Sequence, residues 1–282
     1  MIESFLASWS LFHNTYITGW FLAALLSLVG VVVVARDQIF LGLAVSQASL
    51  LGVALGMWLA SALPHEPAST FRSELWLSLW SISFGAMAAF LTSRPWGLGR
   101  ESPEAITGWV YATAASVAVL VLSRSPHGLE EVHRLLSSTI IGASATDVVT
   151  FGFLLLLAVV AAARWHEAIT LLVMDADMAG AVGLAVRPCN TVLSLWAAFA
   201  IGLSIRVSGL LFTFGSLILP ALIAKNVVRE VRAMFWAAPV IALATTLCAF
   251  VLANYYDLPP GQVAVALQGL LLTCAWLLRR RE

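Results

Sequence analysis

Long hydrophobic runs follow one another along almost the whole chain, separated by short polar breaks. Nine of these runs approach the roughly 20 residues that a helix needs to cross about 30 Å of hydrocarbon. Alternating strand patterns are absent from them, and only helices satisfy their own backbone in lipid without closing a barrel. The predicted helices cover approximately residues 16–35, 40–60, 74–93, 105–122, 148–165, 190–206, 208–225, 233–253 and 261–278.

These runs predict an all-α polytopic membrane protein, a bundle of about nine transmembrane helices. Its composition agrees, because 61% of the 282 residues are hydrophobic and 11% are charged, more apolar surface than one soluble core can bury. No Ser/Gly-rich linker divides the chain, so residues 1–282 are predicted to form a single domain. The boundary between 190–206 and 208–225, at Arg206-Val207-Ser208-Gly209, is the least distinct, and a count of eight helices remains open there.

Charge distribution predicts the orientation. A net charge of zero argues against nucleic-acid binding. Arg and Lys gather in short cytoplasmic loops, and with the N-terminus outside the inner connections hold eleven of them against four outside. The inner residues are Arg36, Arg94, Arg100, Arg164, Arg187, Lys225, Arg229, Arg232, Arg279, Arg280 and Arg281; the outer residues are Arg72, Arg124, Arg134 and Arg206. We therefore expect the N-terminus outside and the C-terminus in the cytoplasm.

Two features inside the spans bear on helix packing. Ala44, Ala48, Gly52 and Gly56 fall four residues apart, which places small residues on one face and lets a neighbouring backbone approach closely. Pro220, within 208–225, frees a backbone carbonyl and is expected to bend or break its helix. It is either a gate element or a plain structural kink.

The polar segment 175–184, between two spans on the predicted inner side, is expected to form a short exposed helix. Asp175 or Asp177 can cap its amino end. Gly183 suits the left-handed residue that ends a helix, and Pro188 prevents continuation. The exposed side is expected to be small, formed by Ala176, Ala179 and Gly180. A partner docking there and a connector resting on lipid headgroups are the two interpretations, and the absence of Lys and Arg within the segment disfavours the second.

Four ordered motifs carry a resemblance to the permease subunits of bacterial ABC importers for zinc and manganese, and the resemblance covers nearly all of the chain. The motifs are Asp175 to Leu184; Val207-Ser208-Gly209-Leu210-Leu211 with Leu217-Ile218-Leu219-Pro220-Ala221; Tyr255-Tyr256-Asp257-Leu258-Pro259-Pro260-Gly261; and Phe40-Leu41-Gly42 with Ser46-Gln47-Ala48-Ser49-Leu50-Leu51-Gly52. The segment 175–184 matches that family's coupling segment.

The resemblance implies a fold like that of the vitamin B12 importer permease, in the bacterial plasma membrane. It implies a dimer with a second permease copy or paralogue, two cytoplasmic ABC ATPases and an extracytoplasmic metal-binding protein. The transported species would be a divalent metal ion, with no cofactor bound by this chain. The residues that would couple to the ATPase are Asp175, Asp177, Ala179, Gly180, Gly183 and Leu184.

Ser46, Gln47 and Pro220 are the candidates for the translocation path. The family commonly carries Asp and His where this chain has Leu43 and Gln47. Carboxylate and imidazole are preferred ligands of zinc and manganese, whereas an amide is a weak donor and leucine is none. The path therefore either conducts the ion with few direct ligands or carries another substrate. Gln47 is expected to face either a neighbouring helix or the path.

Outer-loop residues His127, Glu131 and His133 are weak metal-ligand candidates, since His and Glu can collect a divalent cation. No sequence motif for catalysis or nucleotide binding is present, so ATP hydrolysis is expected on a partner and not in this chain. Two other functions stay open: the same architecture importing iron or an iron chelate, and a non-conducting membrane scaffold or sensor subunit.

Overall fold

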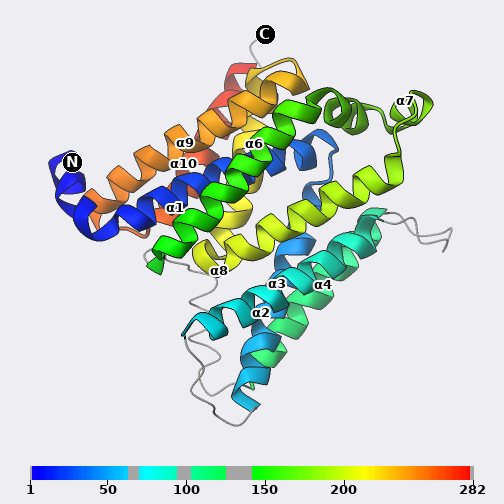
Figure 1. The fold of residues 1–282 in the computed structure, drawn as a ribbon. Coiled ribbons are helices and arrows are strands. Elements are labelled where there is room, and N and C mark those ends of the chain that lie inside the picture. The colour runs from blue at the N-terminus through cyan, green and yellow to red at the C-terminus, as the bar shows by residue number, and fades with distance from the viewer. Residues whose placement is uncertain (1, 63–69, 94–102, 125–141, 280–282) are drawn as a thin grey trace. The chain divides into compact units, whose positions relative to one another are not determined.

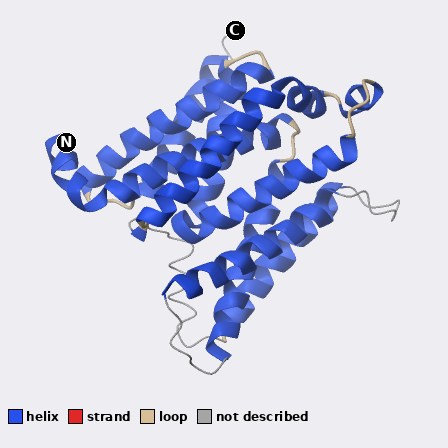
Figure 2. Ribbon diagram, in the orientation of Figure 1, coloured by secondary structure: helices blue, strands red, loops and turns tan. Residues whose placement is uncertain are grey.

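The computed structural model describes residues 2–62, 70–93, 103–124 and 142–279. Within these residues the chain is helical, with short turns between helices and no strand (Figures 1 and 2). The helices are α1 (Ile2–Ala35), α2 (Ile39–Ala62), α3 (Thr70–Ser93), α4 (Pro103–Leu122), α6 (Ala145–Met174), α7 (Ala176–Ala181), α8 (Val186–Val227), α9 (Val231–Tyr256) and α10 (Pro260–Arg279).

Eight of the described helices, all except α7, are long and apolar enough to cross a membrane. The predicted all-α membrane fold is thus confirmed. The chain divides into two compact units. The first contains α1, α6, α7, the end of α8, α9 and α10, and the second contains α2, α3, α4 and the beginning of α8. The prediction of a single domain over residues 1–282 stays a prediction.

In the first unit, α1 and α9 run antiparallel. Near the beginning of α1, the Tyr16 hydroxyl accepts a hydrogen bond of 3.2 Å from Nδ2 of Asn254, near the end of α9. Further along α1, Leu28 lines the same cavity as Phe235, near the beginning of α9. The C-terminal end of α1 and the N-terminal end of α9 therefore lie at the same end of this unit (Figure 1).

Two more segments of the first unit run parallel to α1. In α6, Gly152 faces the ring of Phe21, whereas His166 lines the cavity that Leu28 also lines. In α8, the Leu217 carbonyl lies directly on Gly30, and farther along Lys225 pairs with Asp37 beyond the end of α1. The carboxyl ends of α1, α6 and α8 thus share one end of the unit with the beginning of α9.

In the second unit, α2 packs against α3 through the predicted stripe of small residues. A Cβ on Gly52 would overlap the backbone of Trp80 in α3, so the two helices approach at backbone distance. Gly56 packs on the indole ring of Trp80, and the Gly56 carbonyl accepts a hydrogen bond of 3.1 Å from Nε1 of Trp76. Ala44 and Ala48 are buried. The predicted helix-packing role of this face is confirmed.

α8 is a single 42-residue element with one sharp break. Straight, it would measure about 63 Å, twice the thickness of the hydrocarbon layer. At Gly209 its backbone adopts φ 71° and ψ −179°, a combination that essentially only glycine adopts. Beside this break the buried hydroxyls of Ser208 and Thr213 lie 3.0 Å apart. The predicted boundary at 206–209 is confirmed, but the helices predicted at 190–206 and 208–225 are joined without a loop.

Two expectations about the helices need correction. The helix predicted at 148–165 continues to Met174, and Trp165 has non-helical angles (φ −118°, ψ 21°) at the predicted end. The polar stretch around Trp165 therefore marks a kink within α6 and not the end of the helix. Pro220, expected to bend or break its helix, does not break it, because its backbone stays helical and the break falls at Gly209 instead; a bend at Pro220 stays a prediction. Glycine permits a large backbone change, whereas the proline ring fits helical φ.

Candidate functional site

The short helix α7 begins at Asp175, a residue that also ends α6. The backbone N–H of Asp175 donates to the Leu171 carbonyl at 2.9 Å and so completes α6. Its side-chain Oδ1 accepts a hydrogen bond of 2.9 Å from the N–H of Met178, in the first turn of α7. Asp175 is therefore the amino-terminal cap, one of the two candidates from the sequence. Asp177 lies in the first turn, where its charge complements the helix dipole.

α7 ends in a Schellman motif at Gly183. The N–H of Gly183 donates to the Gly180 carbonyl, and the N–H of Leu184 donates to the Ala179 carbonyl, both at 3.0 Å. This pair of bonds satisfies the last carbonyls of the helix and needs a left-handed residue. Gly183 supplies it with φ +94°. The left-handed glycine predicted from the sequence is confirmed, and both ends of α7 are fixed by local hydrogen bonds.

The exposed side of α7 agrees with the expected one at Ala176 and Gly180, which are exposed, and differs from it at Ala179. Ala179, expected on the outer face, is 0% exposed and is the residue by which α7 packs inward. Larger apolar side chains are exposed as well, since Met178 is 56% and Val182 is 71% exposed. Met174, four residues before Met178, is also exposed. The surface offered to solvent is thus mixed: the large apolar side chains of Met178 and Val182 lie among small residues and the exposed carboxylates of Asp175 and Asp177.

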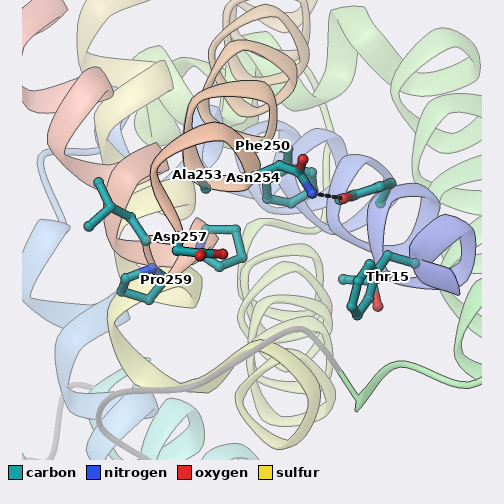
Figure 3. Close-up of a pocket in the computed structure, with 10 residues that line it drawn as sticks. Thr15, Phe250, Ala253, Asn254, Asp257 and Pro259 are labelled. Carbon is teal, nitrogen blue, oxygen red and sulfur yellow. Dashed lines mark hydrogen bonds between the residues drawn. The ribbon is translucent and has the colours of Figure 1, made fainter. Parts of the chain in front are cut away.

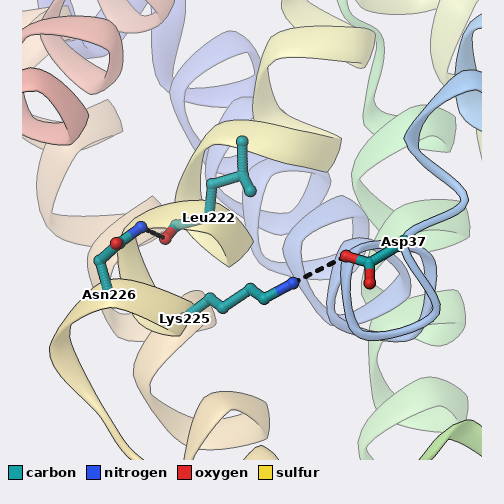
Figure 4. A network of polar contacts seen from close by, with 4 residues as sticks. All are labelled: Asp37, Leu222, Lys225 and Asn226. Atoms are coloured by element: carbon teal, nitrogen blue, oxygen red, sulfur yellow. Dashed lines mark hydrogen bonds and ion pairs between the residues drawn. The ribbon is translucent and has the colours of Figure 1, made fainter. Parts of the chain in front are cut away.

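Basic residues gather at the end of the first unit where α6 ends and α7 begins. At that end Lys225 Nζ lies 2.8 Å from Oδ1 of Asp37 (Figure 4). Asp37 has a left-handed backbone, φ 54°, in the turn after α1. Burial lowers the pKa of the neighbouring Arg36 guanidinium. The cations on or beside the helix ends that share this side are Arg36, Lys225, Arg229 and Arg232; Arg164 lies ten residues before the end of α6.

The candidates for a translocation path are buried in their own units. In α2, the Ser46 hydroxyl donates to the Gly42 carbonyl at 2.7 Å, so it is bound within its own helix. Gln47 is 9% exposed, and Leu43, one turn before it, is half-buried. Pro220 is buried in α8. Ser46 and Gln47 belong to the second unit and Pro220 to the first.

A cavity of about 350 Å³ opens at the opposite end of the first unit, between the beginning of α1 and the α9–α10 turn (Figure 3). Phe12, Tyr16 and Phe250 provide aromatic walls, and Asn254 lies between them. Asn254 Nδ2 donates to the hydroxyls of Ser8 at 2.9 Å and Tyr16 at 3.2 Å. The turn itself is the sequence motif 255–261, in which Asp257 has a left-handed backbone (φ 52°) and ends α9.

The weak metal candidates His127, Glu131 and His133 lie outside the described residues. Among the residues that the structure does describe, no three His, Cys, Asp or Glu side chains are grouped so that they could hold a metal ion.

Sequence reasoning missed one residue that the packing depends on. Gly30 lies in the apolar run of α1, and the carbonyl of Leu217 in α8 occupies the position that a Cβ would take. A lone glycine among valines was the available signal, because glycine inside a helix is costly without a packing reason.

Residues 8–279 match the ABC 3 transport family. The high-affinity zinc uptake system membrane protein ZnuB of Haemophilus influenzae is 20% identical over 94% of this chain and 96% of its own length. A protein of Thermotoga maritima described as "Probable metal transport system membrane protein" is 24% identical over 92% of this chain and 87% of its own.

The solved structure of PsaBC from Streptococcus pneumoniae in complex with Fab contains a chain with the same fold. The TM-score is 0.81 at 17% identity, over 98% of this chain and 95% of that one. The family match runs from the first span to the last, and eight of the helices in the described part of the chain are apolar and long enough to cross a membrane. The chain therefore belongs to the ABC 3 transport family and is a membrane permease subunit of an ABC transporter.

Proposed function

We propose that this permease imports a divalent transition-metal ion, zinc or manganese, across the bacterial plasma membrane. Membership of the ABC 3 transport family carries the proposal. The descriptions of the two relatives, zinc uptake and metal transport, support a metal substrate. The chain works as one of two permease subunits, receives the ion from an extracytoplasmic binding protein, and takes its energy from cytoplasmic ATPases.

The coupling segment in this proposal is residues 175–184, with α7 at its centre. Caps at Asp175 and Gly183 hold the helix without help from a partner. A preorganised helix binds at a smaller entropic cost than a loop that must fold on contact. Met178 and Val182 provide exposed apolar anchors for a groove on the ATPase. Asp177, Gly180 and Leu184 complete the segment, whereas buried Ala179 fixes it to the permease.

The proposed orientation places the coupling segment in the cytoplasm. Within the first unit, the shared ends of α1 and α8 and the beginning of α9 carry Arg36, Lys225, Arg229 and Arg232, which supports an inner position under the positive-inside rule. The opposite end, with the cavity at Asn254 and Asp257, would then face outward. The N-terminus lies outside and the C-terminus inside in this arrangement.

For the path, we assign Gln47 the position next to the moving ion, with Ser46 and Pro220 as further candidates. A polar side chain within a membrane span is costly and usually faces a partner or a cavity. Leu43 precedes Gln47 by one helical turn on the same face of α2. Because leucine has no donor atom, this face offers no second side-chain ligand to a metal ion. Such a path binds the ion weakly and releases it readily.

Substitution at Gln47 tests this assignment. Gln47→His introduces an imidazole that holds zinc or manganese more tightly. The metal concentration that half-saturates uptake should therefore fall, and the maximal rate of uptake should fall with it. Gln47→Leu removes the last polar atom and should slow uptake at every concentration. The measurement is uptake of radiolabelled zinc and manganese at low external metal. If both variants transport like the parent, Gln47 serves packing alone.

The function as a whole is tested by deleting the gene and measuring cellular metal. Cells grown at limiting metal should contain less zinc or less manganese than the parent, and the intact gene should restore the content. A chain with Gly52→Val, which obstructs the contact between α2 and α3, serves as the inactive control. Unchanged zinc and manganese in the deletion strain would refute a metal-import function.

A further inference from the structure

A groove on the first unit is bounded by three membrane-spanning helices, α1, α6 and α9, which lie side by side (Figure 1). It has a volume of about 320 Å³. Most of its walls are apolar: Ala24 and Leu28 from α1, residues between Leu155 and Ala163 from α6, and residues between Phe235 and Leu243 from α9. Two ionisable side chains, His166 and Arg232, complete the lining.

The polar and apolar parts of the groove lie at opposite ends. Arg232 is in the first turn of α9, and Leu243, at the other end of the lining, comes eleven residues later. In α6, His166 and Leu155 are also eleven residues apart. Because α6 and α9 run antiparallel, His166 lies at the same end of the groove as Arg232, and Leu155 lies at the same end as Leu243. Eleven residues of helix rise about 16 Å, which is half of the ~30 Å hydrocarbon layer. The groove therefore has the depth of one lipid leaflet.

The ionisable end has the character of a membrane interface. Trp236 lines the groove there and is exposed, and exposed Trp165 lies beside His166 at the kink of α6. Tryptophan is enriched at the level of lipid headgroups. Arg232 is exposed and forms no ion pair among the described residues. His166 Nε2 lies 3.8 Å from Oε1 of the highly exposed Glu167 and has no hydrogen-bond partner there.

From this arrangement we infer that the groove binds one anionic phospholipid. An acyl chain lies along the apolar walls of α1, α6 and α9, and the phosphate lies against the Arg232 guanidinium. Guanidinium groups bind phosphate through paired, charge-assisted hydrogen bonds. Close in sequence to His166 and Arg232 lie Arg164 and Arg229, against Glu167 and Glu230. With Arg232 the three arginines exceed the two glutamates, a balance that favours an anionic headgroup over a zwitterionic one.

The proposal predicts lipid that survives purification. The full-length permease, extracted in mild detergent and passed through detergent exchange, should retain one phosphatidylglycerol per chain by native mass spectrometry. After delipidation, added phosphatidylglycerol should rebind at least about five- to tenfold more tightly than phosphatidylcholine. Glycerol 3-phosphate, which has the phosphate but no acyl chain, should not bind measurably.

Three variants separate the parts of the site. Arg232→Gln should weaken phosphatidylglycerol binding about five- to tenfold and remove the preference over phosphatidylcholine. Ala162→Phe should fill the apolar groove and abolish retention of both lipids, while circular dichroism and the melting temperature of the delipidated protein stay unchanged. Arg187→Gln is the matched control, because Arg187 is also exposed but does not line the groove; it should bind like the parent.

Two results would overturn the inference. Equal retention of both lipids by the parent and all three variants would mean ordinary annular lipid only. Efficient crosslinking between two permease copies that both carry Trp236→Cys, with no lipid retained, would mean that a second chain covers the groove. Neither result bears on metal uptake, so the metal-import proposal is tested separately.

Discussion

Gly30→Ala is expected to prevent stable packing of α1 against the end of α8. The added methyl group would occupy the position of the Leu217 carbonyl oxygen and would lie 2.8 Å from its carbonyl carbon. Both are backbone atoms, so no side chain can rotate away and one helix must move. Overpacking of this kind usually costs about 1–3 kcal/mol and occasionally more, and we expect the upper end of that range or beyond. The measurement is the melting temperature of the detergent-purified permease.

Gly269→Ala is the matched control for this substitution. Gly269 also lies in a membrane-spanning helix of the first unit, but no neighbouring atom lies within 4 Å of the position that a Cβ would take. Alanine should therefore be neutral there, or stabilising by up to about 1 kcal/mol through helix propensity. Equal melting temperatures for Gly30→Ala and the parent would contradict the backbone contact between α1 and α8.

Gly183→Val is expected to abolish metal uptake without unfolding the membrane helices. A β-branched residue at φ +94° is strained by about 1–3 kcal/mol, and α7 has only six residues to resist that strain. The Schellman bonds to Ala179 and Gly180 should be lost, and with them the fixed position of Met178. We expect normal expression and dimerisation, little ATPase retained by tagged permease, and little uptake.

Two further sets of variants interpret that result. Gly183→Asn should retain function, because asparagine tolerates a left-handed backbone better than other side chains. Met178→Asp and Val182→Asp change only exposed apolar side chains and leave both caps intact, so they should reduce ATPase retention without affecting stability. Normal ATPase retention and uptake in Gly183→Val would mean that 175–184 is only a connector.

The caps of α7 were predictable because capping is local. Asp175 bonds to a residue three positions away, and the Schellman bonds at Gly183 span at most five positions, so neighbouring sequence contains the necessary information. The small-residue stripe on α2 was predictable for a related reason, since a repeat of four selects one helix face. Ala179 was assigned to the wrong side because burial of a six-residue helix depends on what it packs against.

Contacts between distant segments were not predictable. Gly30 and Leu217 are far apart in sequence, and nothing around either residue identifies the other. The helix end expected at residue 165 was wrong for a different reason. A polar stretch containing Arg164 and His166 ends the apolar run, but the backbone continues as helix after a kink at Trp165. Hydropathy locates the hydrocarbon boundary, and it does not locate the end of the helix.

Reconstituted transport tests the central claim most directly. The permease would be purified with its ATPase, incorporated into liposomes with the ATP-binding side outward, and supplied with the extracytoplasmic binding protein inside. Loaded zinc or manganese should leave the lumen only when external ATP is hydrolysed, and Gly183→Val should not support this movement. ATP hydrolysis with no net movement of either ion, while the liposomes remain sealed, would contradict a metal-importing permease.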